Sequence, residues 1–153
     1  MTIINYLGAD AFINRSYYLL DTFRGLESTQ LTKNELDKLN RFGQPYSECY
    51  EDVKRTFREF AFVKLIRGII PNTLLEVPSQ KVVFMHIDLN SAKPEVATLR
   101  CFWDKVVPGG IVLFDDYGWY ESKEQRIALD ELATELSTKI LALPTGQGLL
   151  IKT

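Results

Sequence analysis

The chain has 153 residues, of which 46% are hydrophobic and 25% charged, and its formal net charge is −2. This balance offers no basic surface for nucleic acid or an anionic membrane, and no apolar run approaches the roughly 20 residues of a membrane-spanning helix. The length suits one domain over residues 1–153, and the start lacks the features of a secretion signal, so we expect a cytoplasmic protein.

Short β-rich runs alternate with segments of helical periodicity, a pattern typical of a parallel sheet built from βαβ units. The first strand is expected at Tyr17–Leu20 and the second at residues 63–66. Between them the pattern predicts a short helix around residues 33–39. A further helix, which Ser47 can cap, carries four apolar residues at helical spacing: Tyr50, Val53, Phe57 and Phe60.

The clearest unit begins at Val82. Residues 82–89 are nearly all apolar, as in a central parallel strand buried on both faces. Ser91 is the expected cap of the next helix, which Pro108-Gly109-Gly110 ends before a second buried strand at residues 111–114. A third helix is expected over about 122–137, followed by two closing runs, 139–143 and 149–152, that can form an antiparallel hairpin. The predicted fold class is a Rossmann-like, doubly wound α/β sheet, mostly parallel, with an antiparallel C-terminal edge strand.

Three aspartates follow the two buried strands. Asp88 ends one strand, and Asp115 and Asp116 end the next, so we expect all three at the sheet edge where ligands bind in open α/β folds. Such carboxylates repel one another unless a cation offsets them, and Mg²⁺ is the natural partner. A raised carboxylate pKa, suited to a general base, is the alternative. Each aspartate could instead only cap the following turn.

Three other side chains near these strand ends allow two interpretations each. His86 shares a strand face with Asp88, so it could orient a ligand or move a proton, or it could be a core residue with satisfied hydrogen bonds. Trp119 and Tyr120 could stack on a sugar or an adenine, or could cover the end of the sheet.

Five segments, in order, resemble the macrocin-type sugar O-methyltransferases, a class I family. The matching segments are residues 21–26, residues 68–74, His86-Ile87-Asp88, Pro108-Gly109-Gly110 through Gly118, and residues 143–148. The resemblance implies methylation of a hydroxyl group, often on a sugar, by S-adenosylmethionine with the help of Mg²⁺. It assigns Asp88, Asp115 and Asp116 as metal ligands, with Asp88 also as base, and Asp21 as the contact to the cofactor ribose. Asn90 departs from the family, which usually has a second acid there.

The start of the chain departs further. The family binds the cofactor on a glycine-rich loop after a first strand, but only Gly8 precedes the Tyr17 strand here, and residues 1–12 resemble the helix after that loop. Without the first strand, Tyr17–Leu20 must pair directly with residues 82–89, or another chain must fill the gap, as in a homo-oligomer. We therefore expect a truncated domain with weak or lost cofactor affinity. The alternative to an enzyme is a catalytically silent binding or oligomerisation module.

Overall fold

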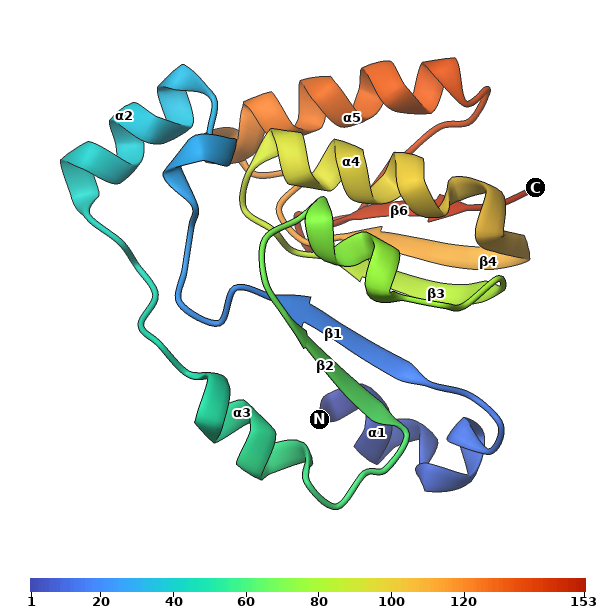
Figure 1. Cartoon of the computed structure of the whole chain (residues 1–153). Helices are drawn as coiled ribbons and strands as arrows, with labels where there is room; N and C mark the ends of the chain where they lie inside the picture. Colours follow the sequence, from blue (N-terminus) through green and yellow to red (C-terminus); the bar gives the residue numbers. More distant parts are fainter. The chain divides into compact units, whose positions relative to one another are not determined.

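In the computed structural model, which describes residues 1–153, the chain forms two compact units. Unit 1 comprises residues 1–25 and 45–77, and unit 2 comprises residues 26–44 and 78–153. Each unit contains a sheet of its own (Figure 1). The single domain expected over residues 1–153 stays a prediction. No helix combines the length and the apolar character that crossing a membrane requires.

Unit 1 contains a two-stranded parallel sheet. β1 (Tyr17–Asp21) and β2 (Val63–Arg67) pair along their whole length, as the sequence predicted for two strands at these positions. The rings of Phe12 and Phe62 stack with their centroids 4.4 Å apart, so aromatic packing stabilises the unit beside the sheet. The other elements are α1 (Thr2–Leu7), α3 (Tyr50–Phe57) and two 3-10 turns, Ala9–Phe12 and Asn72–Glu76.

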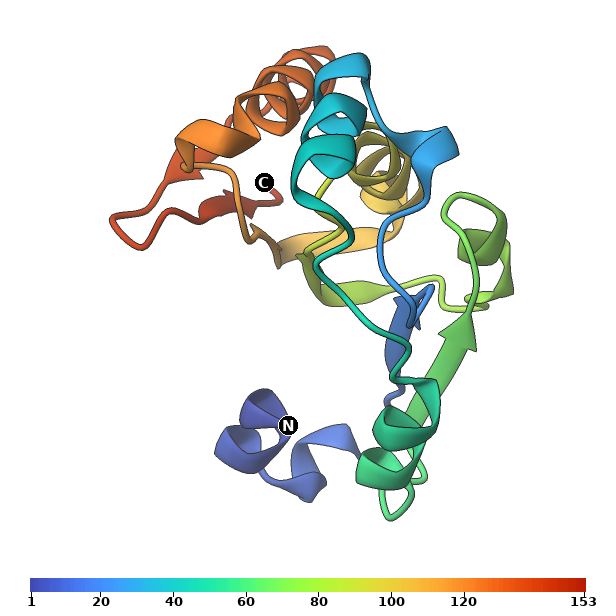
Figure 2. The same ribbon diagram turned by 90° about the vertical axis from the view of Figure 1, so that its left-hand side faces the viewer.

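Unit 2 contains a four-stranded sheet in the order β3-β4-β6-β5. β3 runs parallel to β4, whereas the C-terminal hairpin of β5 and β6 is antiparallel to it, which confirms the predicted fold class. Helices α4 and α5 lie side by side over one face of this sheet (Figures 1 and 2). The elements are α2 (Lys33–Phe42), β3 (Val82–Ile87), α4 (Ala92–Phe102), β4 (Val106–Phe114), α5 (Lys123–Glu135), β5 (Leu141–Ala142) and β6 (Gly148–Ile151), with short 3-10 turns at Ser28–Gln30, Trp103–Lys105 and Tyr120–Ser122.

The core of unit 2 lies between this sheet and its two helices. Alternate residues of β4 point into the core, because successive side chains of a strand face opposite sides. Val112 and Phe114 are almost fully buried there against residues such as Leu99, Leu129 and Leu150. The other face of the same sheet is partly open, with 37% of Ile111 and 50% of Ile151 exposed.

β4 starts five residues earlier than the sequence predicted. Pro108-Gly109-Gly110, expected to precede the strand, lies inside it, and the pairing with β3 shifts register between Val82 and Phe84. Gly109 adopts a positive φ of 79°, and a Cβ on Gly110 would lie 2.8 Å from the Val107 carbonyl oxygen. The two glycines therefore allow an irregular strand where the pattern indicated a break.

The predicted cap of α4 is different in the structure. Ser91 precedes the helix, but its hydroxyl donates to the Leu89 carbonyl oxygen instead of accepting from the helix. The Ala92 N–H donates to Glu35 Oε1 of α2 at 2.9 Å. Glu35 Oε2 also accepts the Thr32 N–H at 2.7 Å in the capping box of α2, so one carboxylate serves two helix N-termini.

The pairing of Tyr17–Leu20 with residues 82–89, one of the two arrangements expected without the first strand, is wrong. β1 pairs only with β2, and β3 is an edge strand whose only partner is β4. Parallel strands normally lie inside larger sheets that are covered on both faces. The pairing of another chain with these strands stays a prediction.

Candidate active site at the ends of β3 and β4

Asp88, Asp115 and Asp116, which we call the acidic cluster, follow two neighbouring strands. Ile87 lies opposite Phe114 in the parallel pairing, and the Asp115 N–H donates to the Ile87 carbonyl oxygen at 3.0 Å. The chain therefore leaves both strands at the same edge of the sheet. This is the edge where open α/β folds bind ligands.

The three carboxylates of the acidic cluster influence one another. Burial raises the pKa of Asp116, and the charges of Asp88 and Asp115 raise it further. Such mutual repulsion requires all three groups to lie near one another, because it falls off with distance and solvent screening. The arrangement therefore favours the uptake of positive charge, either a proton or a cation.

Two side-chain amides hold members of the acidic cluster. Asn90 Nδ2 donates to Asp88 Oδ1 at 3.0 Å, and Gln147 Nε2 donates to Asp115 Oδ1 at 2.9 Å. Asn90 reaches this position from a backbone with a φ of 55°, a conformation that asparagine tolerates better than most residues. At the position where the resemblance noted in the sequence predicted an acid, this chain has a donor that orients Asp88.

The acidic cluster does not form a ready-made coordination shell. No group of three or more His, Cys, Asp or Glu side chains in the structure is arranged to hold a metal ion. The donor chemistry suits a hard cation such as Mg²⁺, which prefers carboxylate oxygens and retains water ligands. The assignment of the three aspartates as metal ligands stays a prediction.

His86 lies beside the acidic cluster. Its Nε2 is 3.5 Å from Asp115 Oδ1, and 35% of its side chain is exposed. Its strand partner is Leu113 on the partly open face of the sheet, so the side chain is not enclosed in the core. This position favours the interpretation in which His86 helps to orient a ligand or to move a proton.

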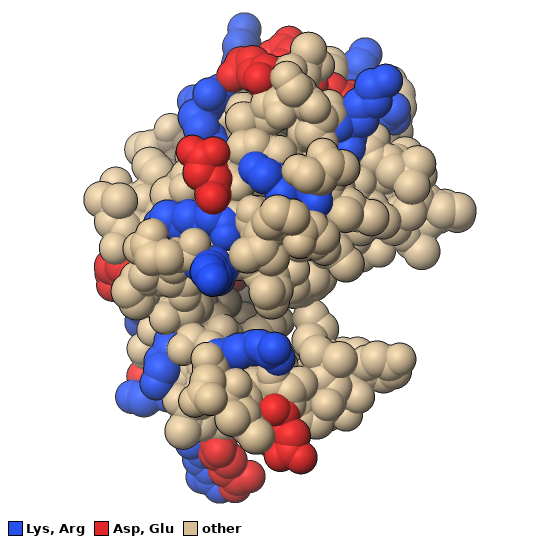
Figure 3. Space-filling view, turned by 90° about the vertical axis from the view of Figure 1, so that its right-hand side faces the viewer, with Lys and Arg blue, Asp and Glu red and all other residues tan.

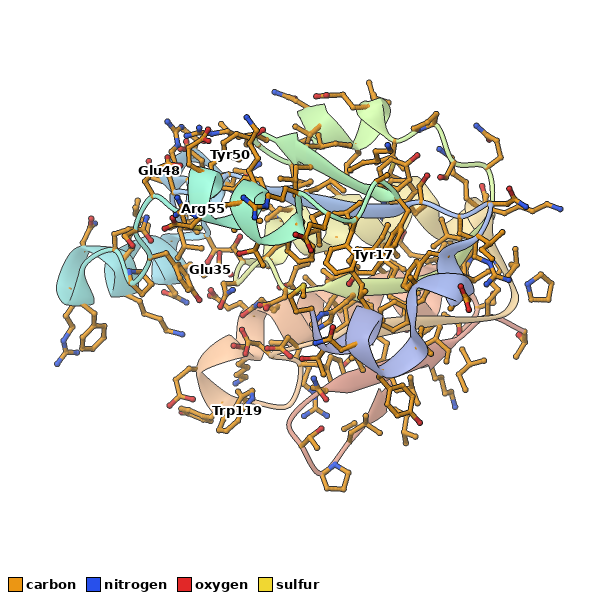
Figure 4. The ribbon with its side chains drawn as sticks, turned by 90° about the horizontal axis from the view of Figure 1, so that it is seen from below. Tyr17, Glu35, Glu48, Tyr50, Arg55 and Trp119 are labelled. Carbon is orange, nitrogen blue, oxygen red and sulfur yellow. The ribbon has the colours of Figure 1, made fainter.

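Trp119 and Tyr120 follow the acidic cluster along the chain. Trp119, labelled in Figure 4, packs its indole against Gly146 of the β5–β6 loop, where a Cβ would lie 2.6 Å from Trp119 Nε1. Even so, 56% of Trp119 and 86% of Tyr120 remain exposed. One part of the Trp119 ring therefore packs on the hairpin loop and the other part is exposed to solvent. Tyr120 does not cover the end of the sheet.

Asp21, the predicted ribose contact, belongs to unit 1. Its Oδ1 accepts the Phe23 N–H at 2.7 Å and stabilises a turn in which Phe23 has a φ of 56°. Nearby, the Arg67 guanidinium bonds to Glu48 at 2.6 Å and stacks over the Tyr50 ring; Glu48 and Tyr50 are labelled in Figure 4. The structure thus gives Asp21 a local role, and its cofactor contact stays a prediction.

The sequence patterns did not indicate the polar residues behind the acidic cluster. Glu95 is only 4% exposed, and burial is the main cause that raises its pKa to about 8. Gln125 Nε2 donates to Glu95 Oε1 at 2.7 Å. A signal for Glu95 was present, because it precedes the buried Leu99 and Phe102 by one and two helical turns.

The charged side chains on one face of the molecule form no single large patch. On the face shown in Figure 3, Lys and Arg lie in several small groups separated by uncharged and acidic residues. The described cysteines, Cys49 and Cys101, are free and half-buried. We therefore take the acidic cluster as the candidate functional site.

Comparison with known proteins identifies a matching family. The family model described as Macrocin-O-methyltransferase (TylF) matches residues 1–140, which is most of the chain. Comparison with curated protein sequences gives no match.

Solved structures of O-methyltransferases have a similar fold. The O-methyltransferase NovP aligns with a TM-score of 0.78 at 21% identity, over 94% of this chain and 62% of its own. The calicheamicin methyltransferase CalS11 aligns with a TM-score of 0.64 at 19% identity, over 90% of this chain and 60% of its own. An apo structure of CalS11, described as a TDP-rhamnose 3'-O-methyltransferase, aligns with a TM-score of 0.59 at 20% identity, over 90% and 59%. The chain therefore spans less than two thirds of each solved chain.

Proposed function

Because the chain belongs to the macrocin O-methyltransferase family, we propose that it serves S-adenosylmethionine-dependent methylation of a hydroxyl group at the acidic cluster. The proposed acceptor is a sugar or another small natural product, by analogy with CalS11, whose description names TDP-rhamnose. In this proposal Asp88, Asp115 and Asp116 hold a divalent cation, Asp88 is also the base, and Asp21 contacts the cofactor ribose.

One observation carries the proposal. Three carboxylates gather at the ends of neighbouring parallel strands, and burial together with the charges of two of them raises the pKa of the third, Asp116. A merely structural role for these residues would leave that repulsion without a benefit. A site that binds a cation and removes a proton uses the same negative charge.

In the proposed reaction the protein forms no covalent bond with the substrate or the cofactor. When bound, S-adenosylmethionine would supply an electrophilic methyl group, and the acceptor oxygen would gain the bond to carbon that the sulfur loses. Asp88 would take the hydroxyl proton. Asp88, Asp115 and Asp116 would hold the Mg²⁺, which would lower the pKa of the acceptor hydroxyl and fix its orientation.

The chain's own residues keep the base in place. Asn90 donates a hydrogen bond to one oxygen of Asp88, and Gln147 donates one to Asp115. These hydrogen bonds restrict the rotation of both carboxylates. Fixed geometry of this kind accounts for much of the rate in reactions that need in-line attack. Trp119 offers an exposed aromatic ring beside the acidic cluster on which an acceptor ring could stack.

The experiment measures transfer of a labelled methyl group from S-adenosylmethionine to TDP-rhamnose, with Mg²⁺ and with a chelator. We expect Mg²⁺-dependent transfer that Asp88→Asn abolishes, while Asp104→Asn, an exposed aspartate of the same unit, leaves it unchanged. Calorimetric titration with Mn²⁺ tests the cation site without the cofactor. A folded chain that neither transfers methyl groups nor binds Mn²⁺ would contradict the proposal and favour a catalytically silent binding module.

A further inference from the structure

A buried polar pair joins the two helices of unit 2. Glu95 of α4 is 4% exposed and Gln125 of α5 is 5% exposed, and Gln125 Nε2 donates to Glu95 Oε1 at 2.7 Å. Buried acids of this kind are rare unless a specific function or partner requires them. The reaction described above makes no use of either side chain.

The Glu95 carboxyl also contacts the backbone next to the acidic cluster. It accepts the N–H of Leu89, the residue that directly follows Asp88. On the other side of the same turn, Asn90 donates to Asp88 Oδ1 at 3.0 Å. Two residues therefore fix the segment that carries Asp88. Glu95 of α4 bonds to its backbone at Leu89, and Asn90 bonds to the Asp88 side chain.

The protonation state of Glu95 fits this position. Burial, with smaller contributions from the charges of Asp116 and Asp88, raises its pKa to about 8, so the side chain is mostly neutral near pH 7. A neutral carboxyl group can accept hydrogen bonds without adding a fourth negative charge behind the acidic cluster.

We propose that Glu95, itself fixed by Gln125, is a positioning residue that holds the Leu89 N–H and thereby sets the direction of the Asp88 carboxylate. This inference rests on the proposed function, because it assumes that the direction of Asp88 matters for a cation and for proton removal. Residues that orient metal ligands from behind typically change metal affinity or activity by about 10–100-fold when they are replaced.

A purely structural role for the pair predicts a different result. In that case Glu95 only joins α4 to α5, and its loss lowers stability without moving Asp88. Thr98→Val is the matched control, because Thr98 is buried on the same helix, and its hydroxyl donates to the Pro94 carbonyl oxygen at 2.8 Å, away from Leu89.

The experiment compares Glu95→Leu, Thr98→Val and the wild-type chain by NMR without metal and by Mn²⁺ calorimetry. We expect Glu95→Leu to shift the Leu89 amide and Asp88 carboxyl resonances and to weaken Mn²⁺ binding about 10–100-fold. Thr98→Val should leave both unchanged. The exchanged pair Glu95→Gln with Gln125→Glu should recover the wild-type values, since it keeps an oxygen for Leu89 and a bond between the helices.

Two outcomes separate this inference from the proposed function. If the wild-type chain binds Mn²⁺ and Glu95→Leu retains its affinity and both resonances, the positioning role is refuted and the site stands. If the wild-type chain binds no Mn²⁺, the cation site is refuted, and the two resonances still decide whether Glu95 positions Asp88. If Glu95→Leu does not fold, Glu95→Met, which also lacks an oxygen for the Leu89 N–H, gives the same readouts.

Discussion

Gln147 donates its side-chain amide to Asp115 across 2.9 Å and so connects the loop between β5 and β6 to the end of β4. The C-terminal hairpin therefore takes part in the acidic cluster as well as completing the sheet. Thr145 donates to Gln147 Oε1 at 3.0 Å, which fixes which way the amide faces. The hairpin loop thus supports a carboxylate that lies 32 residues earlier in the chain.

Gln147→Leu tests this support. Loss of the amide should weaken Mn²⁺ binding about tenfold or more, because Asp115 loses the donor that orients it. The measurement is calorimetric titration. Gln80→Leu is the matched control, since Gln80 is an exposed glutamine whose amide donates to the Pro78 carbonyl oxygen. Equal affinities for the two variants would show that Gln147 serves only the loop.

Asp116→Asn should have opposite effects with and without metal. Burial and the charges of Asp88 and Asp115 raise the pKa of Asp116 and so destabilise the metal-free fold. Removal of the Asp116 charge should therefore increase the free energy of unfolding by up to about 1 kcal/mol. With Mg²⁺ at about 100 times its dissociation constant, the wild-type chain should gain about 2.7 kcal/mol and become the more stable form. Urea unfolding with and without Mg²⁺ checks both. The same order under both conditions would contradict the cation site.

The raised pKa of Glu95 predicts how stability depends on pH. The unfolded chain releases this proton near pH 4.5, whereas the folded chain retains it until about pH 8. Between these values the folded state binds more protons, so its stability falls as the pH rises, by about 1.4 kcal/mol for each pH unit. The contribution is fully present below pH 4.5 and is lost as the pH passes about 8.

Glu95→Gln isolates this dependence, because glutamine does not titrate. We expect the stability of the wild-type chain relative to Glu95→Gln to decline by several kcal/mol between the two pH values, as measured by urea unfolding. A constant difference would mean that Glu95 is charged in the folded protein at neutral pH.

Gly146→Ala should disturb the hairpin loop and Trp119 together. Gly146 has a φ of 87°, and a Cβ there would meet the indole at 2.6 Å. Gly43→Ala is the control, because Gly43 has a φ of 80° but open space around it. Backbone strain should cost each variant about 1 kcal/mol, and the contact with Trp119 should cost Gly146→Ala a further amount of about 1–3 kcal/mol. Equal losses by urea unfolding, with unchanged tryptophan fluorescence, would contradict the contact.

The apolar runs predicted where the strands lie but not how deeply they are buried. β3 is an edge strand with 58% of Val83 and 37% of Phe84 exposed, so the prediction of a central strand buried on both faces was wrong. Residues 82–87 and 111–114 form apolar runs, and such runs between helical segments indicate parallel strands whatever their surroundings. The positions of Asp88 and Asp115 followed from the strands alone. The expected hairpin at the C-terminus also followed, because its connection is short.

Other features depend on residues that are far apart in the chain. The Ala92 N–H donates to Glu35, 57 residues earlier in the chain. Local sequence rules identify only Ser91 as the helix cap and cannot identify so distant an acceptor. The early start of β4 depends on a register shift against Val82, which the glycines only permit. The division into two units reflects strand pairing, which periodicity alone does not determine.

The two ends of the stretch that contains α2, residues 26–44, are joined by hydrogen bonds. The Leu26 N–H donates to Gln44 Oε1 at 3.2 Å, and Gln44 Nε2 donates back to the Leu26 carbonyl oxygen at 3.1 Å. Residues 26–44 therefore form a closed loop around α2. The entropic cost of closing such a loop rises only slowly with its length. A change in the length of this stretch would leave the strand pairing of both sheets unaltered, because neither sheet takes a strand from it.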